Sequence, residues 1–119
     1  MGSMAPSPFE LVKALIAVAS TEAGFEEPKY LLRRHREVYA AKFRDDAIYL
    51  ARENTDLSYS QLAELFQRHH TSLIGAWRRA KLRRERNVPR RDGRTWIAWH
   101  EYLLEKAKAQ CVSSTPDQA

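Results

Sequence analysis

Two amphipathic stretches of helical spacing lie between Ser58 and Arg86, separated by only three polar residues. Ser58 and Gln61 have the spacing of a capping box, which marks the start of a short helix. The apolar face of this helix is made of Tyr59, Leu62, Ala63 and Phe66. After a predicted turn at 67–69, a longer helix spans about 70–86 and faces inward through Leu73, Ile74, Trp77 and Ala80. This order of elements predicts a helix-turn-helix.

The rest of the chain is predicted to form four more helices, at about 7–21, 28–33, 38–54 and 96–110. Ser7 and Glu10 repeat the capping-box spacing, and Gly24 suits a left-handed helix end. The residues expected to be buried are Phe9, Val12, Ile16 and Ala19, one of Tyr30, Leu31 and Leu32, and then Phe43, Ala47, Leu50 and Ala51. The last helix carries the apolar residues Trp96, Ile97, Trp99, Leu103 and Leu104. The polar face of the 38–54 helix is assigned Lys42, Asp45, Asp46 and Arg52. No alternating strand pattern is visible, so the predicted fold class is all-α.

The chain has 119 residues, which suits one domain. Residues 1–6 are read as a cloning tag or disordered start, 7–86 as the helix-turn-helix domain, 87–94 as a basic linker, 95–110 as a C-terminal amphipathic helix and 111–119 as a disordered tail. No apolar run approaches the roughly 20 residues that span a bilayer, and no secretory signal is seen. The single Cys111 provides neither a disulfide framework nor a cysteine metal cluster. A cytoplasmic location is expected.

Charge is unevenly distributed along the chain. Residues 29–91 contain 16 Lys and Arg against 7 Asp and Glu, a balance of +9, whereas the remainder contains 4 against 8, a balance of −4. Such segregation favours a surface that binds a polyanion, although a basic face that is merely solvated is the alternative.

The predicted turn at 67–69 and the first turn of the 70–86 helix offer side chains suited to reading DNA bases. These residues are Arg68, His69, His70, Thr71 and Ser72. An arginine can bind guanine through two hydrogen bonds, and a threonine methyl can contact a thymine methyl. Gly75 lowers helix propensity, which makes sense if the backbone approaches DNA closely. The alternative is that Thr71 or Ser72 only caps the helix.

Further cations are predicted to contact the DNA backbone, which sets register and affinity but carries no base information. The predicted phosphate contacts are Arg33, Arg34, Lys42, Arg44, Arg52, Arg78 and Arg79. The connector that holds Arg33, Arg34 and Arg36 is similar to an arm that enters the minor groove, because a narrow A·T-rich groove attracts guanidinium groups. Trp96 and Trp99 either fold back on the domain or present an aromatic patch to a partner protein.

No catalytic or cofactor site is predicted. The adjacent His69 and His70 lack the i, i+4 spacing of a helical zinc site, and no glycine-rich phosphate loop is present. Nothing in the arrangement of Ser, His and Asp suggests an activated nucleophile. The sequence therefore gives no reason to expect an enzyme, a metal or a small-molecule substrate.

Residues 9–86 resemble the C-terminal DNA-binding domain of the bacterial replication initiator DnaA, a Trp-repressor-like helix-turn-helix. The run from Arg68 to Leu73 is similar to the signature Arg, Asp, His, Thr, Thr and aliphatic residue of that family. The resemblance implies that this run reads the major groove, that Arg36 enters the minor groove, and that Arg44, Arg52 and Arg79 approach phosphates. His69 replaces the signature aspartate, one residue is deleted near Gln67, and the ATPase module is absent. The chain also resembles the DNA-binding part of alphaproteobacterial gene-transfer-agent activators.

These observations predict a stand-alone, sequence-specific binder of double-stranded DNA that regulates transcription at promoters, with the last helix recruiting a partner such as an RNA polymerase subunit. Nucleoid association would follow. The alternatives are an adaptor that docks acidic proteins, a replication-control factor that competes for DnaA-like boxes, and a nonspecific nucleoid or RNA binder. Too few aromatic residues interleave the basic segment for single-strand stacking to be favoured.

Overall fold

The computed structural model describes residues 7–32 and 38–113, which form six helices with no strand among them. The helices are α1 (Pro8–Glu22), α2 (Pro28–Leu32), α3 (Val38–Asn54), α4 (Tyr59–Phe66), α5 (His70–Arg86) and α6 (Trp96–Ser113). The all-α prediction is confirmed. Each predicted helix is present with its ends shifted by three residues at most, and α6 includes the first three residues of the predicted tail.

Local sequence signals account for several helix ends. Ser7 and Glu10 form the predicted capping box of α1, in which each side chain bonds the other residue's backbone N–H at 3.1 Å. Ser58 and Gln61 form the second box, at 3.1 and 2.9 Å, and so start α4. Gly24 follows α1 with φ of +92°, as the sequence predicts. These caps fix where α1 and α4 begin independently of the tertiary packing.

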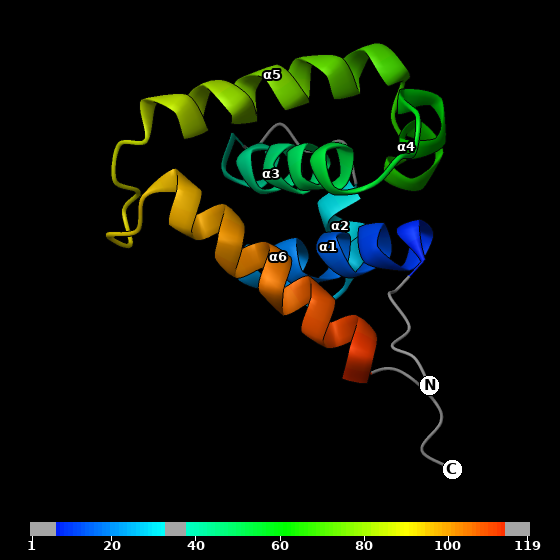
Figure 1. The fold of residues 1–119 in the computed structure, drawn as a ribbon, viewed down its shortest axis with the longest axis horizontal. Helices are drawn as coiled ribbons and strands as arrows, with labels where there is room; N and C mark the ends of the chain where they lie inside the picture. Colours follow the sequence, from blue (N-terminus) through cyan, green and yellow to red (C-terminus); the bar gives the residue numbers. More distant parts are fainter. Residues whose placement is uncertain (1–6, 33–37, 114–119) are drawn as a thin grey trace.

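Helix α3 is central, because it packs against α5 on one side and against α1 on the other (Figure 1). Helix α4 leads directly into α5, and α6 packs mainly on α1. Phe43, Ala47, Leu50 and Ala51 of α3 are all buried, as predicted. None of the helices in the described ranges is both long and apolar enough to cross a bilayer.

Phe9 is a correction to the predicted core, because its side chain is 45% exposed. The other three residues of the predicted stripe, Val12, Ile16 and Ala19, are buried. Phe9 lies in the first turn of α1, where the neighbouring helices no longer cover it. Helical periodicity predicts the side of a helix that faces the core, but not how far along that helix its neighbours extend.

Helix α6 contributes to the same core as the other helices. Trp99, Leu103 and Ala107 are buried in the main hydrophobic cluster, and the Trp99 ring meets Phe43 edge-on with centroids 5.8 Å apart. Trp99 is only 2% exposed, so it folds back on the domain, as one of the two alternatives has it, and does not form an exposed aromatic patch. Trp96 is half-buried against this cluster.

Candidate nucleic-acid interface

The α4–α5 pair holds the first turn of α5 at the surface. Gln67 takes a left-handed conformation (φ 56°) at the end of α4, and Arg68 N–H donates to Ala63 O at 3.0 Å. Phe66 and Leu73 are fully buried where the two helices meet. The turn is therefore fixed by backbone hydrogen bonds and by apolar packing, while residues 69–72 remain exposed.

His69 is the N-cap of α5. Its Nδ1 accepts a hydrogen bond from Thr71 N–H at 3.2 Å and lies 2.8 Å from Thr71 Oγ1. The alternative in which Thr71 or Ser72 caps the helix is therefore wrong, because both lie inside the first turn of α5. The imidazole of His70 lies beside that of His69, with ring centroids 4.3 Å apart. His69 thus has a local structural role at a position predicted to read bases.

Replacing His69 with alanine is expected to lower the free energy of unfolding by about 1 kcal/mol, because an N-cap acceptor is lost. His69→Asp, which restores an acceptor and adds negative charge at the helix N-terminus, should recover that stability. Urea denaturation of the three proteins tests this. A destabilised aspartate variant would show that the imidazole stabilises the turn in some way other than capping.

A pocket of about 320 Å³ lies between α3 and the first three turns of α5. Its lining includes Arg44, Asp45, Arg68, Thr71, Ser72 and Arg79. Five of these six were predicted to bind bases or phosphates, and Asp45 was not. The fold therefore brings together side chains that are 35 positions apart in the sequence.

Arg44 and Arg68 are anchored within the protein as well as lining this pocket. Arg44 is buried and donates from Nη1 to Leu31 O at 2.9 Å, and Arg68 Nη2 donates to Leu32 O at 3.3 Å. Burial, followed by the neighbouring Arg68 guanidinium, lowers the pKa of Arg44. Both arginines therefore bond the last carbonyls of α2, and Arg44 has little surface available for a phosphate.

The other predicted cations are dispersed. Arg78 is exposed on α5, whereas Arg52 is half-buried with its guanidinium 4.7 Å from the centre of the Tyr59 ring. Lys42 is exposed but lines a different pocket. Arg33, Arg34 and Arg36 lie outside the described residues.

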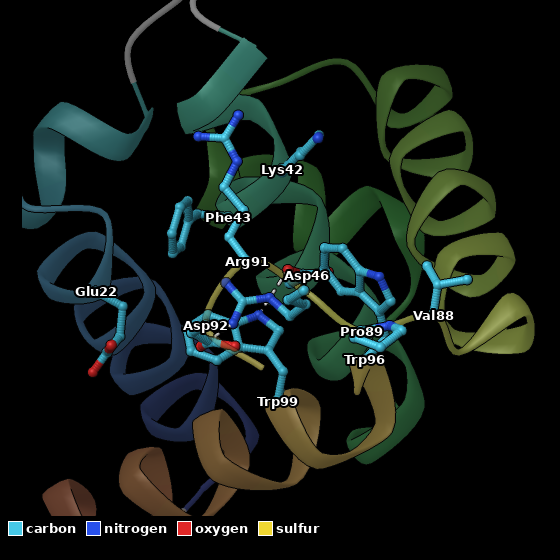
Figure 2. A pocket seen from close by; sticks show the side chains of 11 residues that line it. Glu22, Lys42, Phe43, Asp46, Val88, Pro89, Arg91, Asp92, Trp96 and Trp99 are labelled. Atoms are coloured by element: carbon cyan, nitrogen blue, oxygen red, sulfur yellow. Dashed lines mark hydrogen bonds and ion pairs between the residues drawn. The ribbon is translucent and has the colours of Figure 1, made fainter. Parts of the chain in front are cut away.

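The pocket that includes Lys42 has a volume of 770 Å³ and lies between α3, α6 and the 88–92 loop (Figure 2). Phe43, Trp96 and Trp99 form its aromatic wall. All three of its carboxylates have partners: Glu22 accepts from Tyr102 Oη at 2.7 Å, Asp92 accepts from Arg94 N–H at 2.9 Å, and Asp46 accepts from Trp99 Nε1 at 3.0 Å. No set of three His, Cys, Asp or Glu side chains in the described part of the chain is placed to hold a metal ion.

Asp45 and Asp46 also correct the sequence prediction, because both are buried although they were assigned to the polar face of α3. Asp45 accepts two hydrogen bonds from Arg79, to Oδ2 from Nε at 2.9 Å and to Oδ1 from Nη2 at 3.0 Å. Asp46 accepts from Trp99 Nε1 at 3.0 Å and lies 2.9 Å from His100 Nε2. Polar atoms that leave water in this way require such partners. The two carboxylates therefore join α3 to α5 and α6.

The comparisons with known proteins add no family assignment: no protein-family model matches the chain, and neither does any curated protein sequence.

Proposed function

We propose that this chain binds double-stranded DNA with sequence preference, as a helix-turn-helix of the Trp-repressor and DnaA type. In this proposal α4 lies across the sugar–phosphate backbone and the first turn of α5 enters the major groove. The observation that carries the proposal is the exposed turn at 69–72, held by buried packing of α4 on α5 beside a pocket lined by three arginines. His70, Thr71 and Ser72 would contact base edges directly.

Electrostatics support a DNA partner. Residues 29–91, which include α3, α4 and α5, carry the +9 balance, whereas the remainder of the chain carries −4. The major groove is about 12 Å wide and admits one α-helix, so a protruding helix end flanked by cations matches its shape and charge. Arg78 and Arg79 lie two turns further along α5 and would meet the backbone that borders the groove.

The biological role we propose is transcriptional regulation at promoters together with a partner protein, within the nucleoid. It depends on the resemblance to stand-alone DnaA-like domains and to gene-transfer-agent activators. The charge segregation is also compatible with an adaptor for acidic proteins or with a factor that competes for DnaA-like boxes. The two alternatives differ in what they predict for purified DNA: the adaptor would not bind it, whereas the competing factor would bind DnaA-like boxes.

The test begins with selection of bound duplexes from a random library, followed by fluorescence anisotropy with a selected duplex and a scrambled one. Thr71→Ala is expected to weaken binding to the selected duplex about tenfold, because a base contact is lost, with little change for the scrambled duplex. Thr21→Ala is the matched control, because Thr21 is exposed on α1, on the other side of α3.

Three outcomes would contradict the proposal in distinguishable ways. A library that yields no preferred sequence but binds throughout would indicate a nonspecific binder. No duplex binding at moderate salt would remove DNA as the partner and favour the adaptor. Equal losses on both duplexes for Thr71→Ala would remove α5 as the reading element.

A further inference from the structure

We propose that Asp45 is a positioning residue that holds the Arg79 guanidinium as an oriented phosphate donor and thereby sets the register of the chain on DNA. This inference rests on the proposed function and assigns a role to a carboxylate that is buried and that a phosphate would repel. It distinguishes Arg79 from a freely moving surface cation.

The geometry of the pair is that of a fixed guanidinium. Arg79 presents Nε and Nη2 to the two oxygens of Asp45, at 2.9 and 3.0 Å, which is the bidentate arrangement that fixes a guanidinium in both position and plane. The Asp45 side chain is 4% exposed, whereas that of Arg79 is 60% exposed. Arg83 Nη1 lies 3.6 Å from Asp45 Oδ2 and adds a second cation to the carboxylate. A rigid buried acceptor thus holds a donor that still faces solvent.

Gly75 defines where this donor points. A Cβ atom at Gly75 would lie 3.5 Å from Arg79 Nη1, which is van der Waals contact. The guanidinium therefore extends along α5 towards its N-terminal turn, with Nη1 beside the helix backbone. Neither hydrogen bond to Asp45 uses Nη1, so we assign this nitrogen as the donor to a DNA oxygen. Arg79 lines the same pocket as Thr71 and Ser72, which places the donor next to residues 69–72, the proposed reading turn.

Two consequences follow from pairing Arg79 in this way. A fixed phosphate contact sets register, and register decides whether the reading turn meets the correct base edges. At the same time the carboxylate cancels positive charge that would otherwise attract any duplex, since nonspecific affinity depends on the number of phosphates neutralised. Asp45 should therefore increase the preference for the selected duplex while it decreases binding to others.

The test is a double-mutant cycle with Asp45→Asn, Arg79→Lys and the combined variant, using the selected and scrambled duplexes over a range of salt concentrations. Asp45→Asn is expected to reduce the ratio of the two affinities about tenfold and to leave scrambled binding unchanged or tighter. For this variant the logarithm of DNA affinity should fall more steeply with the logarithm of salt concentration, by about one released ion, because Arg79 no longer has a charged partner. Arg79→Lys keeps the charge but not the planar fork, so it should reduce the same ratio. The combined variant should reduce the ratio of the two affinities no further than either single variant does.

A purely structural cross-link between α3 and α5 would give a different pattern. Losses of affinity that add in the combined variant, or that are equal for the selected and scrambled duplexes, would overturn the positioning role. Asp92→Asn is the charge-matched control, since Asp92 pairs with Arg90 in the 88–95 loop, and it should leave the ratio unchanged. If Asp45→Asn lowers the melting temperature too far for binding to be measured, Arg79→Lys at the exposed site remains decisive. An Arg79→Lys variant that keeps the wild-type ratio of affinities for the selected and scrambled duplexes would refute an oriented contact. A wild-type protein without a preferred duplex would instead refute the proposed function itself.

Discussion

Replacing Asp46 with alanine is expected to lower the free energy of unfolding by about 3–5 kcal/mol. The Asp46 side chain is 2% exposed and accepts from Trp99 Nε1 and, more weakly, from Arg83 Nη2 at 3.4 Å. Arg84 Nη1 lies 3.2 Å from His100 Nδ1, and because arginine only donates, Nδ1 must accept and Nε2–H must donate to Asp46. Alanine would deprive Trp99 Nε1, His100 Nε2 and Arg83 Nη2 of the carboxylate that accepts their hydrogen bonds.

Urea denaturation followed by tryptophan fluorescence measures this loss directly. Asp56→Ala is the matched control, because Asp56 is exposed in the turn before α4 and its replacement should change stability by about 0.5 kcal/mol or less. A loss below about 1 kcal/mol for Asp46→Ala would show that water or relaxed side chains replace the carboxylate, and that the buried network contributes little.

The helices could be predicted from the sequence because their signals are local. Capping pairs three residues apart and apolar residues at helical spacing place α1, α4 and α5 without any knowledge of the tertiary structure. Asp46 shows where this reasoning stops. It lies three residues after Phe43 and four before Leu50, on the apolar stripe of α3, and its position therefore indicated burial more reliably than its polar type. Its partners on α6 are 53 and 54 positions away, so nothing local identified them.

As with the helices, the parts of the candidate site that depend on local sequence could be predicted, and the long-range pairings could not. The short polar turn at 67–69 and the start of α5 could be identified from the amphipathic stretches on either side, because their spacing is local. The pairing of Asp45 with Arg79 spans 34 positions, and the bond from Arg44 to Leu31 O depends on how α2 packs on α3. Sequence reasoning therefore treated every arginine as a free cation, whereas the fold assigns several of them acceptors within the protein.

The buried network connects the candidate interface to the last helix. Trp99 and His100 of α6 share Asp46 with Arg83, and Arg83 also lies within 3.6 Å of Asp45, which holds Arg79. A continuous series of hydrogen bonds and ion pairs thus runs from α6 through α3 to the proposed reading face of α5. We expect the geometry of that face to depend on α6, although α6 itself packs mainly on α1.

Removing α6 by ending the chain at Asn87 is therefore expected to abolish cooperative folding. The truncation uncovers the face of α1 that packs on α6 and removes the buried Trp99, Leu103 and Ala107. Loss of one buried Trp side chain alone costs about 3–5 kcal/mol, which is comparable with the total stability of about 5–15 kcal/mol typical of a small domain. Thermal unfolding monitored by circular dichroism tests this expectation. Ending the chain at Ser113 is the control, because it keeps all of α6 and should leave the melting temperature unchanged. A truncated chain that melts cooperatively and keeps its preference for the selected duplex would show that residues 7–86 fold and bind on their own and that α6 is an accessory helix.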